Sequence, residues 1–437
     1  MKQERVYVND VKKGQVFIEG WIHEIRDLAK IKFILLRDMT GVVQCIIKDE
    51  KLMKKFSDLS VESVISINGE AKPAQVKSPE VSQKEIEVEI KEFEIISKAE
   101  KLPINIHDKD VETGFAKRLD YRYLDLRNPK NLLIFKIETD VLKAMRDFCI
   151  KTGFLELCSP KFQSAAAESG AEMFSVDYFG KKAYLAQSPQ FYKQMAVISG
   201  FERVFEIAPV FRANPSHTTR HDTEFTMFDA EIGFINSFED VMHWEEQWLA
   251  YILEQIKEKY GKQIKEVFNI DLVVPKIPFP RITMEEAHKI IREAGIKVGE
   301  DSDLDAEGEK ALGDYIQKKY KHEFVFLTLF PWKVRPFYHM RPKDNPRVTN
   351  SFDLLWKGLE ITTGAQREHR HDILIKQAKE KKISEKPIQW YLDMFKYGAP
   401  PHGGFGLSPT RVVMQMLNLP NVREATFAPR DTERLTP

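Results

Sequence analysis

Cysteine is scarce in this sequence, which has three among 437 residues: Cys45, Cys149 and Cys158. No two of them form a Cys-x-x-Cys pair. A structural zinc site or a disulfide framework needs more cysteines at closer spacing. We therefore expect three reduced thiols and a cytoplasmic protein.

Long apolar runs and an excess of charge are also absent. No stretch approaches about 18 consecutive apolar residues, and the N-terminus, MKQERVYVND, lacks the apolar core of a signal peptide. We expect neither a membrane span nor a secretion signal. The 66 Lys and Arg residues balance the 66 Asp and Glu residues. This balance excludes a protein that binds polyanions through a basic tail. If the protein binds nucleic acid, it must do so through a local basic surface.

The sequence does contain enough apolar residues for several packed domains. Hydrophobic residues make up 43% of the chain, which excludes a disordered polymer. At roughly 100–200 residues per domain, the length indicates about two to four domains.

Residues 1–103 are predicted to form a small β-barrel. Apolar residues alternate in five short runs, and a helix is expected between the third and the fourth run. Five short strands and one helix favour a Greek-key barrel of the OB type, and such barrels commonly bind oligonucleotides. The runs lie at 16–22, 32–38, 41–47, 63–69 and 84–96, and the helix at 52–59.

The rest of the chain is predicted to be a hinge at 104–130 and a larger α+β domain at 131–437. Apolar residues at helical spacing predict helices at 131–155 and 239–260. A proline-rich break follows, and the polar, helix-rich section after it predicts an insertion at 275–340.

Clusters of polar residues interrupt the apolar pattern of the larger domain at four places. The first, 187–193, follows an apolar strand. The second spans 204–231, where Arg212 ends a strand and, after a polar loop, Asp229 and Glu231 share a strand face. Arginines at such a hairpin can bind phosphates through paired hydrogen bonds. A solvated strand end and surface ion pairs are the alternatives for these two clusters.

The other two clusters supply oxygen ligands and glycines. Within 358–369, Glu360 and Thr363 are hard oxygen ligands close together, as a magnesium–phosphate site requires. Arg367 is available for a carboxylate. The fourth cluster has three glycines, which allow close approach to a flat ligand, before a helix that carries Arg411. Each cluster alone is a weak signal, but all four in this order are a specific one.

In this order the clusters resemble the motifs of the class II aminoacyl-tRNA synthetases, most closely the archaeal-type aspartyl-tRNA synthetases. Over essentially the whole chain, motif 1 resembles 133–160, motif 2 resembles 210–231 and motif 3 resembles 403–411, and the ending at 428–437 is also of the aspartyl type. The resemblance implies an α+β fold, in which the N-terminal OB-type β-barrel joins a class II catalytic domain made of an antiparallel sheet flanked by helices. It also implies a homodimer with Pro160 at the interface.

The activity that the resemblance implies has two steps. Aspartate and ATP give aspartyl-adenylate and pyrophosphate, and the aspartyl group then moves to the 3′ end of a tRNA. Attack of a carboxylate on the α-phosphate depends on positioning and on neutralisation of charge, which arginines and Mg²⁺ supply. No general base is expected in the first step.

The resemblance also implies roles for individual residues of this sequence. Arg212 is expected to bind the α-phosphate, Arg411 the γ-phosphate, and Phe225 to stack on adenine. Glu360 and Thr363 are expected to hold Mg²⁺. Arg212, Glu360 and Arg411 are the expected catalytic residues. Further ATP contacts are expected from Asn214, Arg220, His221, Asp222, Ser408, Pro409 and Thr410.

Three of these positions depart from the family pattern. Asn214 stands where the family usually has glutamate near the adenine amino group, Thr363 replaces the more usual serine, and Thr410 stands where the family often has glutamate. Because asparagine still accepts a hydrogen bond, we expect a modest change in ATP affinity from Asn214. Thr363 keeps the hydroxyl of serine.

Aspartate recognition is expected to depend on two cations. By resemblance, Lys193 and Arg367 face the side-chain carboxylate of the substrate, and Asp229 with Gln190 holds its amino end. Asparagine has nearly the same shape but no charge, so binding alone can discriminate strongly and no editing domain is expected. The other aspartate contacts implied are Glu168, on the loop that closes over the amino acid, Arg212 and Thr363.

The barrel is expected to read the tRNA anticodon. Trp21 and Phe33 offer stacking surfaces and Arg26 a phosphate contact, with a place in the barrel core as the alternative for the two aromatic residues. His23 and Pro79 resemble the relaxed family form, which charges both tRNA(Asp) and tRNA(Asn), whereas strict forms tend to have tryptophan and lysine. We therefore predict a non-discriminating enzyme, whose Asp-tRNA(Asn) product needs a downstream amidotransferase.

Several alternatives stay open at this point. One alternative is a strict aspartyl-tRNA synthetase, which differs from the predicted non-discriminating enzyme only in that it charges tRNA(Asp) alone. Asparaginyl-tRNA synthetases share the fold and motifs but tend to have His-Ser-Gly at the positions of His402-Gly403-Gly404. A non-catalytic RNA-binding paralogue is expected to lose Arg212, Glu360 or Arg411, and an asparagine synthetase derived from this domain lacks the barrel. No DNA or membrane partner is expected.

Overall fold

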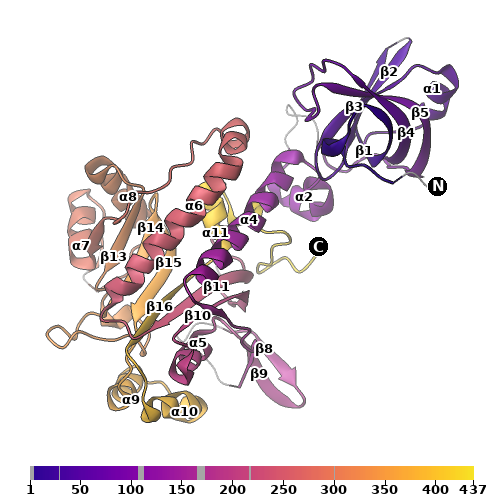
Figure 1. The fold of residues 1–437 in the computed structure, drawn as a ribbon. Helices are drawn as coiled ribbons and strands as arrows, with labels where there is room; N and C mark the ends of the chain where they lie inside the picture. The colour runs from indigo at the N-terminus through magenta and orange to yellow at the C-terminus, as the bar shows by residue number, and fades with distance from the viewer. Residues whose placement is uncertain (1–3, 29, 107–112, 165–172, 216–217, 300) are drawn as a thin grey trace. The chain divides into compact units, whose positions relative to one another are not determined.

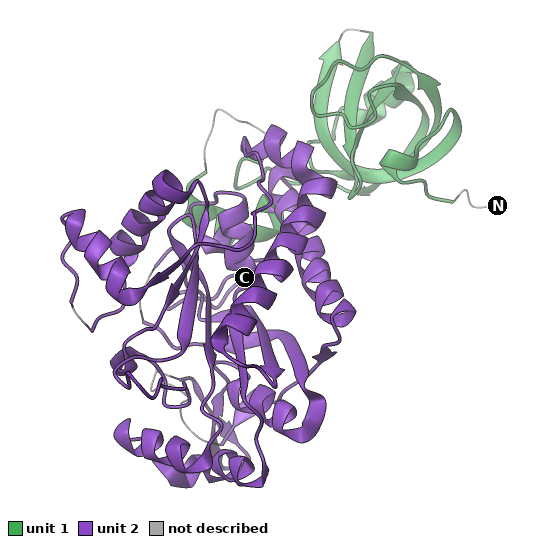
Figure 2. Cartoon of the chain, turned by 60° about the vertical axis from the view of Figure 1, so that its left-hand side comes forward, with its two compact units in different colours: residues 1–125 green, residues 126–437 purple. Residues whose placement is uncertain are grey.

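The computed structural model describes the chain except for residues 1–3, 29, 107–112, 165–172, 216–217 and 300. The chain divides into two compact units, 1–125 and 126–437 (Figure 2). The division falls within the segment that the sequence predicts as a hinge. Within the described ranges, no helix is both long enough and apolar enough to cross a membrane.

Unit 1 contains a closed five-stranded barrel with the strand order β1-β2-β3-β5-β4 (Figure 1). Alternate side chains of each strand fill the barrel, among them Ile18, Ile34 and Val43, none of which is exposed. The strand order, with one helix after the third strand, confirms the predicted OB-type barrel. The elements are β1 (Gly14–Leu28), β2 (Ile31–Arg37), β3 (Val42–Ile47), α1 (Glu50–Phe56), β4 (Val64–Pro73) and β5 (Ile86–Ser97).

The mixed-charge stretch at the end of unit 1 is helical. It forms α2 (Phe115–Asp120) and α3 (Arg122–Asp125). Arg118 Nε donates to Asp125 Oδ1 at 2.7 Å, and Arg122 Nη1 donates to Asp125 Oδ2 at 2.6 Å. These charge-assisted bonds give this part of the predicted hinge a structure of its own.

Unit 2 contains an eight-stranded sheet with the order β12-β13-β14-β15-β16-β11-β10-β6. Neighbouring strands are antiparallel except for the pairs β12–β13 and β10–β6. This confirms the predicted antiparallel sheet and excludes a Rossmann fold, whose sheet is mostly parallel. The strands are β6 (Leu155–Glu156), β10 (Arg203–Phe211), β11 (Glu224–Gly233), β12 (Arg281–Thr283), β13 (Phe324–Thr328), β14 (Ser351–Trp356), β15 (Leu359–Gln366) and β16 (His402–Leu407).

Two long helices, α4 (Pro129–Lys151) and α6 (Phe238–Phe268), pack against each other and, with the sheet, enclose the main core (Figure 1). Asn128 caps α4, and Ser237 and Asp240 form a capping box at the start of α6. Asn269 ends α6 in the left-handed conformation. The helices predicted at 131–155 and 239–260 are thus confirmed, with shifted ends.

Smaller elements surround the sheet, including a three-stranded sheet of order β7-β9-β8. The segment 275–340, predicted as an insertion, contributes β12 and β13 to the main sheet, together with two helices, α7 and α8. The remaining strands and α-helices are β7 (Phe162–Gln163), β8 (Ser175–Tyr178), β9 (Lys181–Leu185), α5 (Gln190–Ala196), α7 (Met284–Glu293), α8 (Ala306–Tyr320), α9 (His371–Glu380), α10 (Glu385–Met394) and α11 (Pro409–Met416).

The three cysteines are all free thiols. Cys45 and Cys149 are buried, and Cys158 is exposed. Burial raises the pKa of both buried thiols, so they stay neutral and pack as small apolar side chains.

Candidate active site

One cavity of about 290 Å³ in unit 2 gathers residues from all four polar clusters. Its lining comes from α5, β11, β15, β16 and the start of α11, and from the segment 335–339 before β14. These central strands and helix ends are rigid supports for functional side chains. The residues named from the sequence that line it are Gln190, Lys193, Arg212, Phe225, Asp229, Glu360, Thr363, Arg367, Ser408 and Arg411.

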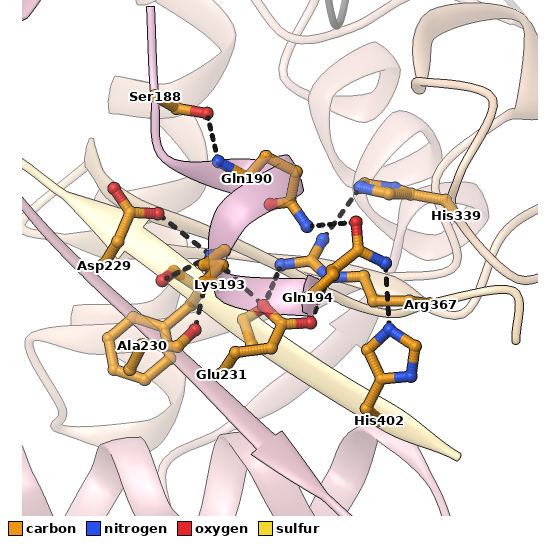
Figure 3. A network of polar contacts seen from close by, with 12 residues as sticks. Ser188, Gln190, Lys193, Gln194, Asp229, Ala230, Glu231, His339, Arg367 and His402 are labelled. Carbon is orange, nitrogen blue, oxygen red and sulfur yellow. Dashed lines mark hydrogen bonds and ion pairs between the residues drawn. The ribbon is translucent and has the colours of Figure 1, made fainter. Parts of the chain in front are cut away.

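Lys193 lies at the centre of a buried polar network (Figure 3). Its Nζ is 2.9 Å from Asp229 Oδ1 and 3.2 Å from Glu231 Oε2. It also donates to the carbonyl oxygens of Ala230 and Phe405. Because an ammonium group has three donors, these contacts already occupy it, and a substrate carboxylate must share or displace one of them.

Glu231 neutralises both cations of the network. Arg367 directly follows β15, and its Nε donates to Glu231 Oε1 at 2.9 Å while its Nη2 donates to Oε2 at 3.2 Å. Glu231 is fully buried. Burial raises its pKa, but the charges of Arg367 and Lys193 outweigh burial and leave the pKa below its usual value. Two cations and two carboxylates, those of Asp229 and Glu231, therefore balance one another.

Asp229 keeps one oxygen for a ligand. Oδ1 accepts from Lys193, whereas Oδ2 is buried and has no hydrogen-bond partner among the described residues. Burial raises the pKa of Asp229, against the opposing charge of Lys193. A buried acceptor in a cavity lining favours a donor from a ligand, such as an ammonium group.

His339 lines the cavity in one defined tautomer. Its Nε2 lies 3.2 Å from Arg367 Nη1, and since arginine only donates, Nε2 accepts and the proton sits on Nδ1. Burial and the charge of Arg367 lower the pKa of His339 well below its usual value, so the ring is neutral. Nδ1 is buried without a partner in the described part of the chain, which makes it a donor for a ligand.

A β-bulge brings Glu360 and Thr363 together. In a regular strand, residues three apart point to opposite faces. The pairing of β14 with β15 shifts here, because Leu355 is opposite Glu360 whereas Leu354 is opposite Thr362. The additional residue re-aims the side chains, and Thr363 Oγ1 donates to Glu360 Oε1 at 3.2 Å.

Arg411 and Arg212 bring positive charge to the cavity lining. Ser408 caps α11 and accepts from the backbone nitrogen of Arg411. Arg411 Nη1 donates to the carbonyl oxygen of Glu360 at 3.0 Å. The guanidinium of Arg212, which follows β10, is 5.4 Å from the centre of the Phe225 ring, within cation–π range.

Several residues predicted to bind ATP do not line the cavity. Asn214 is exposed. Arg220 Nη1 lies 2.8 Å from Glu309 Oε2. Asp222 Oδ2 accepts from Thr426 Oγ1 at 2.7 Å, and burial raises the pKa of Asp222 to about 6. Asp222 thus holds its loop to the C-terminal segment.

His221, Pro409 and Thr410 also lie outside the cavity lining. His221 Nδ1 is 2.5 Å from Thr218 Oγ1, and burial, with nearby arginine charges, lowers the pKa of His221 to about 4, so the ring is neutral at pH 7. Glu168 lies outside the described residues.

Sequence reasoning missed four residues of the site, because they belong to no recognised motif. Three of them lie in the segment 335–339, within the region that the sequence predicts as an insertion. An arginine, two aromatic residues and a histidine in this segment were the signal from which a site could have been found. The missed residues are Arg335, Tyr338, His339 and Asp353. Glu231 was noted as the neighbour of Asp229 on the strand, but not as the partner of two cations.

The oxygen atoms of Glu360, Thr363 and Asp353 fit a hard divalent cation. Asp353 lies opposite Thr363 in the strand pairing, and its Oδ1 is buried with no hydrogen-bond partner among the described residues. Burial raises the pKa of Asp353 to about 7, and the charge of Glu360 adds to this effect. In the described part of the chain, no three His, Cys, Asp or Glu side chains form a metal site by themselves, so a cation here must take further ligands from water or from a substrate.

In unit 1, a β-bulge places His23 in the barrel wall, since β1 has one additional residue there relative to β2. Arg37 Nη1 lies 2.8 Å from His23 Nδ1, and Arg37 Nη2 donates to Glu62 Oε2 at 2.8 Å. On the other side of the ring, His23 Nε2 lies 2.8 Å from Glu80 Oε2. Because Glu80 follows Pro79, this contact links the two positions that the sequence singled out.

The other predicted anticodon residues lie on the same barrel. Trp21 and Phe33 are half-buried, so each ring packs on the barrel and keeps an accessible part. Arg26 is exposed, and its Nε lies 2.6 Å from Glu24 Oε1. Pro79 is exposed.

Comparison with known proteins gives consistent likenesses over the whole chain. The family model described as tRNA synthetases class II (D, K and N) matches residues 115–432, and that of an OB-fold nucleic acid binding domain matches 16–96. The aspartate–tRNA(Asp/Asn) ligase of Aeropyrum pernix is 46% identical over 97% of this chain and 96% of that protein. The aspartate–tRNA(Asp) ligase of Pyrococcus abyssi is 42% identical over 97% of this chain and 96% of that protein. The asparaginyl-tRNA synthetase of Pyrococcus horikoshii, solved with asparaginyl-adenylate, has a TM-score of 0.92 at 32% identity, covering 99% of this chain and 100% of that one.

Proposed function

The chain belongs to the class II tRNA synthetases of the D, K and N group, and from this premise we propose that it charges both tRNA(Asp) and tRNA(Asn) with L-aspartate. Its activity is that of an aspartate–tRNA ligase, and enzymes of this class use ATP as a substrate. The observation that carries the relaxed tRNA choice is the contact of His23 with Glu80, beside Pro79. We place the reaction in the cytoplasm.

The size and chemistry of His23 support the relaxed choice. His23 is buried, and its Nδ1 accepts from Arg37. Tryptophan is larger and has no acceptor nitrogen, so it would lose this bond and push the loop of Pro79 and Glu80 away from the barrel. With histidine, the loop keeps its bond to the barrel, and this arrangement supports acceptance of either base at the position where the two anticodons differ. The resulting Asp-tRNA(Asn) requires an amidotransferase downstream.

The cavity is suited to the activation step. Arg212 binds the α-phosphate and stabilises the charge that develops during attack, Phe225 stacks on adenine, and Arg411 binds the γ-phosphate. The attacking carboxylate is already ionised, so this step needs positioning and charge neutralisation and no base. The supports on β10, β11 and α11 hold these groups before the substrates arrive.

Mg²⁺ is the cation that we propose at Glu360, Thr363 and Asp353. When bound, it neutralises phosphate charge that the arginines leave uncompensated. EDTA is therefore expected to abolish aspartate-dependent exchange of pyrophosphate with ATP, and added Mg²⁺ is expected to restore it. Full exchange in the presence of EDTA would contradict this assignment.

Aspartate recognition depends on the polarity of the buried network. Arg367 and His339 Nδ1 donate to the side-chain carboxylate of aspartate, with Lys193 sharing its charge, and Asp229 Oδ2 together with Gln190 binds the ammonium group. The amide nitrogen of asparagine would point N–H groups at these donors and lose charge-assisted bonds. Binding alone can therefore discriminate strongly against asparagine.

We also propose a homodimer formed through the segment around Pro160. Large apolar side chains are exposed near it, with Ile150 at 58%, Leu155 at 52% and Phe162 at 54% exposure. Exposed apolar side chains of this size favour burial against a second copy. Light scattering is expected to give twice the mass of the chain, and a monomer at micromolar concentration would contradict this part of the proposal.

The experiment that tests the proposed function is charging with labelled aspartate on separate tRNA(Asp) and tRNA(Asn) transcripts. The protein is expected to charge both, and His23→Trp is expected to depress charging of tRNA(Asn) more than that of tRNA(Asp). Charging of tRNA(Asp) alone by the unsubstituted protein would contradict the relaxed choice. Equal loss on both tRNAs in His23→Trp would remove the role given to His23.

A further inference from the structure

A closed ring of four contacts connects α8 to the cavity. Glu309 Oε2 lies 2.8 Å from Arg220 Nη1 and accepts from the backbone nitrogen of Glu360 at 3.3 Å. Arg411 completes the ring, since its Nη2 donates to the carbonyl oxygen of Arg220 at 3.4 Å and its Nη1 to that of Glu360 at 3.0 Å. Glu309 therefore contacts both the β10–β11 loop and the start of β15.

Glu309 acts on the cavity from outside it. Arg411 and Glu360 line the cavity, whereas Glu309 and Arg220 do not. The side chain of Glu309 is 10% exposed and that of Arg220 is 26% exposed, so the ion pair is partly shielded from water. Any influence of Glu309 on a ligand must therefore pass through the residues that it holds.

The helix that carries Glu309 is seated firmly on the turn before β15. A Cβ atom on Gly313 would lie 2.6 Å from the backbone of Gly358, and one on Gly358 would lie 2.9 Å from the carbonyl oxygen of Glu309. The two backbones thus touch with no side chain between them. Because Gly358 is two residues before Glu360, this contact fixes the position of α8 relative to Glu360.

The charge of Glu309 also offsets repulsion among arginines. Burial lowers the pKa of Arg411, and the charges of Arg212 and Arg220 lower it further, while those of Glu360 and Glu309 oppose this. Removing Glu309 would leave three neighbouring guanidinium groups with one carboxylate fewer to hold them together.

We propose that Glu309 is a positioning residue of the ATP site: it holds Glu360 directly and fixes Arg220 and, through it, Arg411, in the arrangement that receives the triphosphate. This inference rests on the proposed function, because that function assigns the triphosphate to Arg411. Arginine loses much rotamer freedom when it is fixed. Ordering it before ATP arrives removes this cost from binding.

The test is aspartate-dependent exchange of pyrophosphate with ATP, without tRNA, in full-length Glu309→Ala and Glu309→Gln. We expect KM for ATP to rise about tenfold in Glu309→Ala and less in Glu309→Gln, which keeps an acceptor oxygen. KM for aspartate should change less than about twofold, since Lys193 and Arg367 are outside the ring. The matched control is Glu307→Ala, which removes an exposed carboxylate from the same turn of α8.

A double substitution separates positioning from general damage to the fold. If Glu309 acts through Arg220, then adding Glu309→Ala to Arg220→Ala should raise KM for ATP by less than about twofold more. Thermal melting reports folding of each variant, and if Glu309→Ala does not fold, Glu309→Gln carries the same comparison.

Three outcomes would overturn the inference: equal effects of Glu307→Ala and Glu309→Ala, fully additive effects of the two substitutions, or a fall in KM for ATP. The last would mean that ATP must break the ion pair. Absence of exchange in the unsubstituted protein would contradict the proposed function itself, whereas normal exchange with unaffected Glu309 variants would contradict this inference alone.

Discussion

At the scale of single residues, the site is a set of buried charges that neutralise one another. Lys193 and Arg367 are paired with Asp229 and Glu231, and all four side chains are at most 3% exposed. Burying an ion is costly unless its partners are in place. Removal of one member therefore leaves an uncompensated charge, and the consequence reaches stability as well as binding.

Glu231→Gln is expected to lower the free energy of unfolding by about 3–5 kcal/mol, because two buried cations lose their shared carboxylate. Urea denaturation measures this loss, and pyrophosphate exchange should disappear with it. The control is Glu239→Gln, since Glu239 is 63% exposed and its loss should cost less than about 1 kcal/mol. Equal stability of the two variants would contradict the role given to Glu231.

Glu138 of α4 is expected to make stability depend on pH. Burial raises the pKa of Glu138 to about 7, against a hydrogen bond from Thr410. In the unfolded chain Glu138 loses its proton near pH 4.5. Its contribution to the free energy of unfolding is therefore complete below that pH and is lost as the pH rises to about 7. The free energy of unfolding of the unsubstituted protein should therefore fall between pH 5 and pH 8. In Glu138→Gln this fall should be smaller, by up to about 3 kcal/mol. Denaturation at both pH values measures it, and an unchanged pH dependence would contradict the assignment.

At the scale of elements, three adjacent strands meet where only glycine fits. Gly404 of β16 is opposite Glu231 of β11 on one side and Ala365 of β15 on the other. A Cβ atom here would overlap the carbonyl oxygen of Ala230 and Glu231 Oε2. Arg367 Nη2 also donates to the carbonyl oxygen of Gly404 at 2.9 Å. The close packing of β11, β15 and β16 thus positions the network that we propose to bind aspartate.

Gly404→Ala is expected to destabilise the protein by about 3 kcal/mol or more, because the overlapping atoms belong to a backbone and to a fixed carboxylate. KM for aspartate should rise with it. In contrast, the Cβ atom added by Gly261→Ala in α6 would make only an ordinary van der Waals contact, with Lys257. This substitution should stabilise the protein by about 0.5–1 kcal/mol. Thermal and urea denaturation of both variants measure the contrast, and similar effects at the two positions would contradict it.

At the scale of the whole molecule, the proposed function assigns separate parts of the reaction to the two units. The cavity belongs to unit 2, and the residues expected to read the anticodon belong to unit 1. In the proposed function, activation of aspartate uses groups of the cavity alone. Transfer to tRNA uses both units, so substitutions in the barrel should separate the two measurements.

Glu80→Ala is expected to leave the rate of pyrophosphate exchange within about twofold of normal, because the cavity is unchanged. KM for tRNA is expected to rise about three- to tenfold, because the loop of Pro79 loses its bond to His23. Charging assays on both transcripts measure the second effect. The exposed Glu85 provides a control in the same segment. A loss of exchange in Glu80→Ala would contradict the separation of the two units.

The sequence by itself was sufficient for the architecture and for most of the cavity lining. Alternation of apolar residues predicts the barrel strands because a strand turns successive side chains to opposite faces. The order of the four polar clusters predicts the antiparallel sheet through the family resemblance. Motif residues such as Arg212, Glu360 and Arg411 could be named in advance because the family resemblance implies their roles.

Only the tertiary structure decided which charges meet. Glu231 and Arg367 are 136 positions apart, and Arg220 and Glu309 are 89 positions apart. The bulge that aligns Glu360 with Thr363 depends on the partner strand, which the local sequence does not contain. Contacts between distant segments leave no trace in local periodicity, because each side chain alone is compatible with a solvated surface. Packing brings these side chains out of water, and from that point each buried charge must find its counterpart.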